Sequence, residues 1–387
     1  MASPKVAQVQ VSKGFGQPEE SERNEAERLF VASQWQLVWW RFRRAKVAVA
    51  STVIVLLVYL IAVFCEFLSP YDPIKQDQLW VFAPPQLPRL KLIDGRPYLV
   101  VYQYSKKRDP VTLKHVYTVE PDRYEVVQFF VQRGKPYKML GLFRTNLRLF
   151  GLSGSSKGTM FLFGTDRLGR DMFSRAMYGT RISVSIGLVG VFLSFVLGVV
   201  FGGFSGLYGG VYDTITQRVI ELLRSVPAVP LWLGLSAAIP KDWPQVRVYF
   251  AITIILSFLT WTGLARVVRG RFLSLRQEDF VTAARLSGAS SSRIVFVHLV
   301  PSVMSHIIAS ITLSIPSMIL SETSLSFLGL GLRPPTISWG VLLQEAQNVR
   351  TVALAPWLMI PGLFVIVTVL CFNFMGDGLR DAADPYA

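Results

Sequence analysis

The chain contains 387 residues, of which 51% are hydrophobic and only 17% are charged, and its formal net charge is +15. Soluble domains average about 25% charged residues, so this composition excludes an ordinary soluble protein and favours a membrane protein. The Lys and Arg residues lie at the ends of apolar runs rather than in a separate basic domain, which argues against nucleic-acid binding and for contact with acidic lipid headgroups.

The first 68 residues divide into three parts. Residues 1–23 are polar and are predicted to form a disordered cytoplasmic tail. Large apolar side chains recur through residues 24–46, which predicts an amphipathic helix on the inner membrane surface. Residues 47–68 are apolar and long enough to cross a bilayer, and they follow Arg41, Arg43, Arg44 and Lys46. Because positive residues stay on the cytoplasmic side, the N-terminus is predicted to be inside.

Residues 69–163 are predicted to form an external insertion. The segments RPYLVVYQY, TLKHVYTVE and YEVVQFFVQ are rich in Val, Tyr and Phe, and Asp-Gly, Asp-Pro and Glu-Pro pairs separate them. Such runs between turn signals are typical of strands. The insertion is therefore predicted to contain a small β-rich module.

Residues 164–376 are predicted to form the transmembrane core. With the first span, five further apolar runs make six: 182–207, 215–239, 248–264, 303–325 and 356–374. An even number of spans places both termini, the loop 266–300 and the C-terminal residues 377–387 in the cytoplasm. Pro227 and Pro230 permit the third span to bend. Glu221 and Arg224, three positions apart on a helix, can pair with each other and are predicted to tether the third span near the inner surface rather than to touch substrate.

One stretch disagrees with this orientation. Residues 164–181, GTDRLGRDMFSRAMYGTR, carry four arginines and lie on the external side under the six-span assignment. The positive-inside tendency applies best to short loops, whereas this stretch ends a long translocated region. The number of spans therefore decides the orientation.

The sequence contains no recognisable metal or nucleotide site. Cys65 and Cys371 lie in apolar runs near opposite ends of the chain, and no Cys/His cluster occurs. The Gly-rich segment 151–159, GLSGSSKGT, lacks the spacing of a phosphate-binding P-loop. Any use of ATP must therefore involve another subunit.

The loop between the fourth and fifth spans contains a short helix with small side chains. Phe280, Ala283, Ala284 and Ser287 share one face, and Gly288 follows Ala284 by one turn. Small residues allow another surface to approach the backbone closely, which suits a helix that docks in a groove of a partner. An ordinary connecting helix with solvated charges is the alternative.

This segment resembles the "EAA" loop of permease subunits of binding-protein-dependent ABC importers. The family pattern has an acidic residue, two alanines, a glycine, an apolar stretch and a closing proline. The matching positions here are Glu278, Ala283, Ala284, Gly288, Ile294 and Pro301. Thr282 departs from the pattern, because the family often has an acidic residue directly before the alanines.

Four other segments resemble the C-type permease of the oligopeptide/dipeptide branch. They are residues 163–189, 205–227, 321–343 and 372–385, in the order expected for that branch. The resemblance covers the chain from residue 163 to its end, together with the basic first span. The insertion between the first two spans is longer than expected for the plain dipeptide-type subunit.

The resemblance implies an all-α polytopic membrane protein of the type I ABC importer kind and a non-catalytic pore subunit in a bacterial inner membrane. The implied partners are a second homologous permease, two cytoplasmic ATPase subunits that bind ATP and Mg, a periplasmic substrate-binding protein and membrane lipid. In the family the EAA helix inserts into a cleft of the ATPase. Ala283, Ala284 and Gly288 would form the contact face, and Arg285 and Arg293 are either rim contacts or membrane-surface charges.

Two polar sites stand out beyond the loop. Glu322 lies in an apolar context near the external end of the fifth span, where it would either meet the amino group of a peptide or hydrogen-bond within the bundle before GLGL. Asp166, Arg170 and Asp171 are predicted to form a salt-bridge network at the outer vestibule. The same three residues could instead face a substrate-binding protein.

The family implies peptide import, and relatives in this branch also carry nickel, opines or cell-wall peptides. A proton-coupled secondary transporter would need embedded carboxylates or histidines and two related halves, of which the sequence offers little. A membrane-embedded hydrolase would need motifs such as HExxH or GxSxG, which do not occur.

Overall fold

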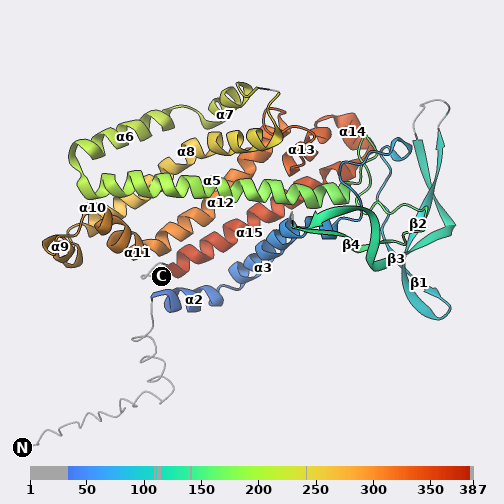
Figure 1. Ribbon diagram of the computed structural model, residues 1–387, viewed down its shortest axis with the longest axis horizontal. Helices are drawn as coiled ribbons and strands as arrows, with labels where there is room; N and C mark the ends of the chain where they lie inside the picture. The colour runs from blue at the N-terminus through green and yellow to red at the C-terminus, as the bar shows by residue number, and fades with distance from the viewer. Residues whose placement is uncertain (1–33, 109, 111–114, 140–141, 241, 384–387) are drawn as a thin grey trace, which may run out of the picture.

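The computed structural model describes residues 34–383, except for residues 109, 111–114, 140–141 and 241. Long helices lie side by side in a bundle, and a small β-sheet module covers one end of it (Figure 1). The predicted tail at residues 1–23 lies outside the described residues, as does the first part of the amphipathic segment. Its described part is helix α2, Gln34–Arg44.

Within the described residues, five helices are long and apolar enough to span a membrane, or six if one bent pair counts as a single span. The long helices are α3 (Lys46–Val63), α5 (Met172–Tyr208), α8 (Gln245–Leu275), α12 (Met304–Phe327) and α15 (Ile360–Ala383). The bent pair is α6 (Gly210–Ser225) and α7 (Ala228–Ala237). The prediction of a mostly helical chain with a small β insertion is confirmed.

Several helices extend beyond the predicted apolar runs. Helix α5 begins at Met172 rather than near residue 182, because the Asp171 side chain caps it by accepting a hydrogen bond from the Ser174 amide at 2.8 Å. Helix α8 continues to Leu275, so the start of the predicted loop 266–300 is helical. Helix α15 runs to Ala383 and includes most of the predicted C-terminal tail. Polar residues can continue a helix outside the hydrocarbon region, where hydropathy no longer marks its end.

The predicted third span, 215–239, is not one straight helix. Helices α6 and α7 meet at an angle of 82°. Val226 takes an extended conformation before Pro227, because the proline ring disfavours helical geometry in the preceding residue. The possible pair of Glu221 with Arg224 does not form among the described residues. Arg218, one turn earlier, binds the Glu221 carboxylate at 2.7 Å.

The β-module follows the first span. Strands β1 (Arg89–Ile93), β2 (Arg96–Arg108), β3 (His115–Met139) and β4 (Phe143–Leu152) form an antiparallel sheet in the order β1-β2-β3-β4. Helix α4 (Cys65–Leu68) and the short 3₁₀ turn Gln78–Trp80 connect α3 to this sheet. Consecutive hairpins explain the order, since antiparallel neighbours need only short connections.

The packing of α5 against α8 holds the centre of the bundle. A Cβ atom on Gly202 would lie 2.4 Å from the backbone oxygen of Ala265, so only glycine allows this approach. Two apolar clusters of buried side chains extend from the pair. One lies toward α12, α13 (Trp339–Leu343) and α15, and the other toward the loop after α8.

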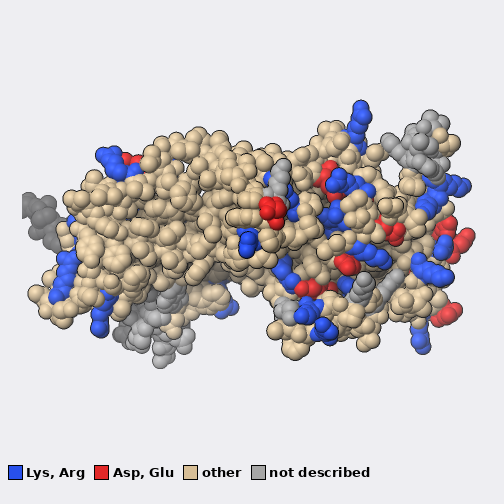
Figure 2. Space-filling view, turned by 45° about the horizontal axis from the view of Figure 1, so that its top comes forward, with Lys and Arg blue, Asp and Glu red and all other residues tan. Residues whose placement is uncertain are grey.

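The two ends of the bundle differ. One end holds the β-module, α13, α14 (Val349–Leu354) and the 3₁₀ turns Gln344–Gln347 and Pro356–Met359. The other end holds α2, the C-terminal end of α15, α9 (Asp279–Leu286), α10 (Ser291–Arg293), the π-helix Ile294–Leu299 and α11 (Val300–Ser302). Figure 2 shows charged side chains of both signs gathered over the β-module, while much of the bundle surface beside it is uncharged. We call the two ends the β-module end and the α9 end.

Candidate functional site

Helix α9 lies at the tip of the α9 end, where it projects from the bundle (Figure 1). The carbonyl of Glu278 starts the helix by accepting hydrogen bonds from the Val281 and Thr282 amides. The Glu278 and Asp279 carboxylates are exposed beside the first turn, where the helix dipole favours negative charge.

The two faces of α9 differ in burial. Val281 is completely buried, and Ala284 packs beside it against the apolar cluster under the loop. Ala283 lies on the outward side with Leu286, which is 85% exposed, and Phe280, which is 42% exposed. The residues predicted to share one contact face therefore lie on two different sides of the helix. Ala284 turns toward its own chain because it follows Val281 by three residues, whereas Phe280 and Ala283 point outward.

Gly288 ends the helix and is not part of a close-packed contact. Its φ is +79°, and a Cβ atom there would meet nothing within 4 Å. The Gly288 amide donates to the Arg285 carbonyl, and the Ala289 amide donates to the Ala284 carbonyl, both at 3.0 Å. This pair of bonds is a Schellman motif, which requires a left-handed residue. The glycine of the predicted pattern is thus explained by backbone geometry.

The remaining positions of the pattern divide between core and surface. Ile294 is buried at the start of the π-helix, and Pro301 is exposed just after it. Proline cannot donate the next helical hydrogen bond, and the Val300 amide bonds five residues back to Val295. Arg285 and Arg293 are both exposed, and no salt bridge joins either one to a described residue.

Glu322 is completely buried in α12 and accepts three hydrogen bonds from serine hydroxyl groups. The donors are Ser183 at 3.1 Å, Ser326 at 2.8 Å and Ser338 at 2.8 Å. Each of these hydroxyl groups also accepts a hydrogen bond from a backbone amide. Ser183 accepts from Trp339, Ser326 from Leu332 and Ser338 from Val341. The carboxylate therefore joins α5, α12 and the segment that leads into α13.

Asp166 is the centre of an ion-pair network at the β-module end. Its Oδ2 accepts a hydrogen bond from Arg170 Nε at 2.6 Å and lies 2.9 Å from Arg175 Nη1. Arg170 also donates to Glu345 at 3.0 Å, and Arg167 lies 3.7 Å from the same carboxylate. Asp166 and Arg170 are thus brought together, whereas Glu345 and Arg175 were not identified from the sequence. Glu345 is far along the chain, so no local pattern indicates it.

Asp171 has a separate role at the start of α5. It is buried and caps the helix through the Ser174 amide. Burial raises the pKa of the Asp171 carboxyl to about 6, and hydrogen bonds from Ser174 oppose this shift in part. Burial also raises the pKa of Glu345 above its usual value. Within the described residues, no salt bridge includes Asp171, so the predicted network contains two of its three members.

The arginines of residues 164–181 have carboxylate partners. Arg170 and Arg175 face Asp166, and Arg181 forms a salt bridge with the Glu66 carboxylate, with a second contact at 2.6 Å. Arg181 also donates to the Ala62 carbonyl at 2.8 Å and so joins α5 to the end of α3. Each of the four arginines in residues 164–181 therefore forms a salt bridge with a carboxylate.

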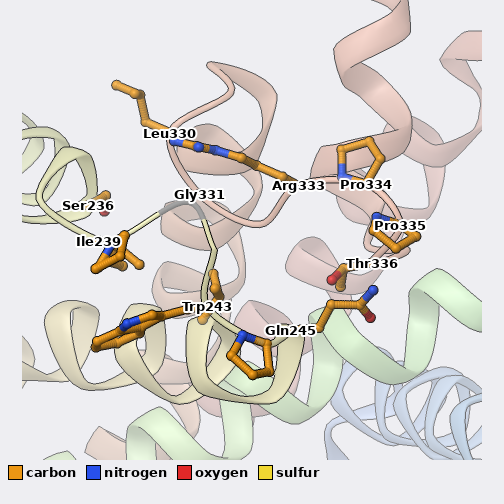
Figure 3. Close-up of a pocket in the computed structure, with 13 residues that line it drawn as sticks. Ser236, Ile239, Trp243, Gln245, Leu330, Gly331, Arg333, Pro334, Pro335 and Thr336 are labelled. Atoms are coloured by element: carbon orange, nitrogen blue, oxygen red, sulfur yellow. The ribbon is translucent and has the colours of Figure 1, made fainter.

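A pocket of about 440 Å³ opens at the β-module end beside α7. Figure 3 shows that it lies between the α7–α8 connection, with Ile239 and Trp243, and the loop that carries Arg333 and Thr336. Arg333 Nε donates to the Gly329 carbonyl at 3.3 Å. Across the described residues, no group of three His, Cys, Asp or Glu side chains is arranged to hold a metal ion.

Two family descriptions match this chain. Residues 198–386 match the binding-protein-dependent transport system inner membrane component, and residues 33–85 match the N-terminal TM domain of oligopeptide transport permease C.

Individual relatives agree with these matches. The oligopeptide transport system permease protein OppC of Bacillus subtilis (strain 168) is 40% identical over 224 residues, which cover 58% of this chain and 71% of that protein. The dipeptide transport system permease protein DppC of the same strain is 38% identical over 225 residues, covering 58% of this chain and 68% of that protein. The glutathione transport system permease protein GsiD of Escherichia coli O1:K1 / APEC is 30% identical over 356 residues, covering 92% and 91% respectively.

Proposed function

Because this chain belongs to the family of binding-protein-dependent transport system inner membrane components, in its oligopeptide and dipeptide permease branch, we propose that it forms half of the pore of an ATP-driven peptide importer. The other half is a second homologous permease. Two cytoplasmic ATPase subunits bind ATP and Mg, and a periplasmic binding protein delivers the peptide. The names of the relatives specify oligopeptides, dipeptides and glutathione, which favours a peptide over nickel or an opine.

In this arrangement the chain crosses the membrane six times, with α6 and α7 as one broken span, and the β-module lies on the periplasmic side. Exposed basic residues support this orientation, since Arg285 and Arg293 lie at the α9 end without a carboxylate partner among the described residues. Each of the four arginines in residues 164–181, at the β-module end, is instead paired with a carboxylate. Unpaired positive charge is what the cytoplasmic side retains. Both termini then lie in the cytoplasm of a bacterial inner membrane.

Helix α9 is the proposed contact with the ATPase. The observation that carries this assignment is the apolar outward face, with Leu286 85% exposed at the tip of the bundle. A leucine so placed on a soluble surface gains by burial in a partner's groove. Phe280 and Ala283 extend the same face, and Arg285 and Arg293 flank it. Val281, Ala284 and Ile294 anchor the helix to the bundle, while Glu278, Gly288 and Pro301 set its ends.

Movement of α9 would be transmitted to the membrane-spanning helices by the buried residues of α9. Val281 and Ala284 pack in the same apolar cluster as residues of α5, α8 and the start of α12. Close packing transmits displacement, because a filled core deforms little. ATP-driven closure of the ATPases would therefore push the α9 ends of these helices together.

The polar sites at the β-module end are assigned structural roles. Glu322 ties the α12–α13 segment to α5 through three serines, which supports anchoring rather than recognition of a peptide amino group. The network of Asp166, Arg170 and Glu345 holds the segment before α5 against the α13–α14 region. Asp171 caps α5 beside it.

Two variants, each of which replaces an exposed aliphatic side chain with glutamate, test whether α9 contacts the ATPase. Leu286→Glu introduces a charge at the α9 end, and Val349→Glu introduces the same charge at an 81% exposed position at the opposite end. Burial of a leucine contributes about 2 kcal/mol, or roughly 30-fold in affinity. We therefore expect Leu286→Glu to lower recovery of the ATPases with the tagged permease by at least that factor.

The control variant Val349→Glu should retain the ATPases and peptide-stimulated ATP hydrolysis. Normal recovery of the ATPases with Leu286→Glu would contradict the assignment of α9. A tagged wild-type chain that purifies from its membrane without any ATPase would contradict the importer itself.

A further inference from the structure

An apolar crevice of about 760 Å³ lies between the first membrane-spanning helix and the hairpin formed by β3 and β4. Its volume is typical of a site for a small molecule. The walls are almost entirely aliphatic and aromatic, and they include Leu57, Leu60 and Phe64 on the helical side and Met139, Phe143 and Leu147 on the hairpin.

The hairpin is amphipathic. Met139 pairs with Phe143 and Tyr137 pairs with Thr145, and all four side chains line the crevice. The intervening pair, Lys138 and Arg144, belongs to the opposite face, because side chains alternate along a strand. The Tyr137 hydroxyl donates to the Leu147 carbonyl, so the one phenol in the wall is satisfied within the hairpin.

The start of β4 and the residue before it are apolar and exposed. Leu142 and Phe143 are among the most exposed large hydrophobic residues of the β-module. On the helical side, Leu57 and Leu60 lie on an exposed flank of α3. Two apolar surfaces thus face each other across a space that no described side chain fills.

The depth of the crevice can be worked out from α3. The helix begins at Lys46, which follows Arg43 and Arg44 and marks one boundary of the hydrocarbon region. At 1.5 Å per residue, Leu57 lies about 16 Å and Phe64 about 27 Å from that boundary. The hydrocarbon region is about 30 Å thick, so the helical wall lies within the leaflet on the β-module side.

We propose that this crevice binds an acyl chain of a phospholipid from the leaflet on the β-module side. The helical wall is continuous with the lipid-facing surface of α3, which a lipid reaches without leaving the bilayer. A soluble protein partner would have to bring further polar backbone against the exposed flank of α3, whereas an acyl chain carries no groups that need hydrogen bonds. Lys138 and Arg144 are both exposed on the other face of the hairpin, where basic side chains can attract headgroup phosphates.

The hairpin thereby clamps a lipid against the first span. Strand β4 is at the edge of the sheet, and the backbone of an edge strand is costly to place in hydrocarbon, which limits how far the sheet can enter the bilayer. The lipid chain fills the crevice and covers the apolar face of the hairpin. The insertion is in this way coupled to the membrane as well as to the helices beneath it.

Spin labels at two adjacent positions test the placement. A spin label is attached to Phe143→Cys or to Arg144→Cys, each in the full complex in phospholipid nanodiscs. The two positions are adjacent in β4, but the first faces the crevice and the second faces the other side of the hairpin. The native thiols, Cys65 and Cys371, are buried, and the unsubstituted chain measures their background labelling. We expect position 143 to be several-fold more accessible to oxygen than to a water-soluble nickel chelate, and position 144 to show the reverse.

Two outcomes of this measurement would overturn the proposal. Equal access of the nickel chelate to both positions would place the hairpin in water. Protection of position 143 from both reagents would mean that a protein surface covers it.

Filling the crevice tests the bound lipid directly. A phosphatidylcholine with a diazirine on one acyl chain should crosslink to the α3–α4 wall and to the hairpin in the wild-type complex. Thr145→Trp places a large side chain in the crevice, whereas Asn146→Trp places it on the opposite face of β4. We expect at least five-fold less crosslinking in the first variant and no change in the second. Equal crosslinking in both would refute a chain bound in the crevice.

Discussion

Replacement of Glu322 separates an anchoring role from a role in recognising substrate. The Glu322 carboxylate accepts hydrogen bonds from three serine hydroxyl groups, and each hydroxyl in turn accepts a hydrogen bond from a backbone amide. In Glu322→Ala, all three hydroxyl groups lose their acceptor in a buried site. Each loss costs about 1 kcal/mol, and the emptied volume adds roughly another. The expected destabilisation is therefore about 4 kcal/mol.

The conservative variant should behave differently. Glu322→Gln keeps the volume and one acceptor oxygen, so it should cost about 1 kcal/mol. At roughly 2 °C per kcal/mol for a large domain, the apparent melting temperature should fall by about 8 °C for the alanine variant and about 2 °C for the glutamine variant. Ser321→Ala is the control, since within the described part of the chain the Ser321 hydroxyl donates to the Ser317 carbonyl of its own helix and to no other residue.

The assay is size-exclusion chromatography of the complex after stepwise heating, combined with peptide uptake below the melting temperature. Anchoring predicts that Glu322→Gln transports peptide at nearly the wild-type rate. An alanine variant with the melting temperature of the wild type would contradict the anchoring role. A glutamine variant that is stable but inactive would also contradict it, because the Glu322 charge would then be needed to recognise the peptide.

Three further predictions concern single contacts. Gly288→Ala should weaken α9 by about 1 kcal/mol because of the positive φ, and Gly288→Asn by less, as measured by the affinity for the ATPases. Asp171 binds a proton more readily when folded, with a pKa of about 6. Its stabilising contribution is therefore present below pH 4 and lost as the pH rises to 6. The free energy of unfolding of the wild type should therefore fall by about 3 kcal/mol between pH 4 and pH 6, and Asp171→Asn should abolish this fall. A variant whose thermal unfolding keeps the pH profile of the wild type would contradict the prediction. Arg269 holds Asp213 through two contacts of 2.5 Å, so Arg269→Leu should impair uptake. The exchange of both residues should restore uptake, and failure of that rescue would exclude the pair as a tie between α6 and α8.

The ion pairs at the β-module end explain why charge counting was ambiguous there. Hydropathy and charge rules treat every arginine as an exposed positive residue. Arg170 and Arg175 instead share Asp166, and Arg181 is paired with Glu66. Only Arg167 in this stretch is largely exposed, at 63% of its side chain. The stretch is therefore much less basic than its sequence indicates.

The α9 loop shows both the strength and the limit of local patterns. The sequence predicted a helix here and its family resemblance, and the family is confirmed. The pattern did not distinguish a residue that meets a partner from one that packs on its own chain. Val281 decides this, because its burial turns Ala284 inward and leaves Phe280, Ala283 and Leu286 outside.

By itself, the sequence determined that most of the chain forms apolar helices, that the insertion is rich in β-strand and to which family the chain belongs. These follow from local properties, since a segment in lipid must satisfy its own backbone hydrogen bonds and strands follow a two-residue alternation. The partners of Asp166 and Glu322, the 82° break after α6 and the crevice beside α3 were decided only by the tertiary structure. Each of these joins residues that are distant along the chain or depends on which of two allowed geometries packing selects, and a local pattern carries neither kind of information.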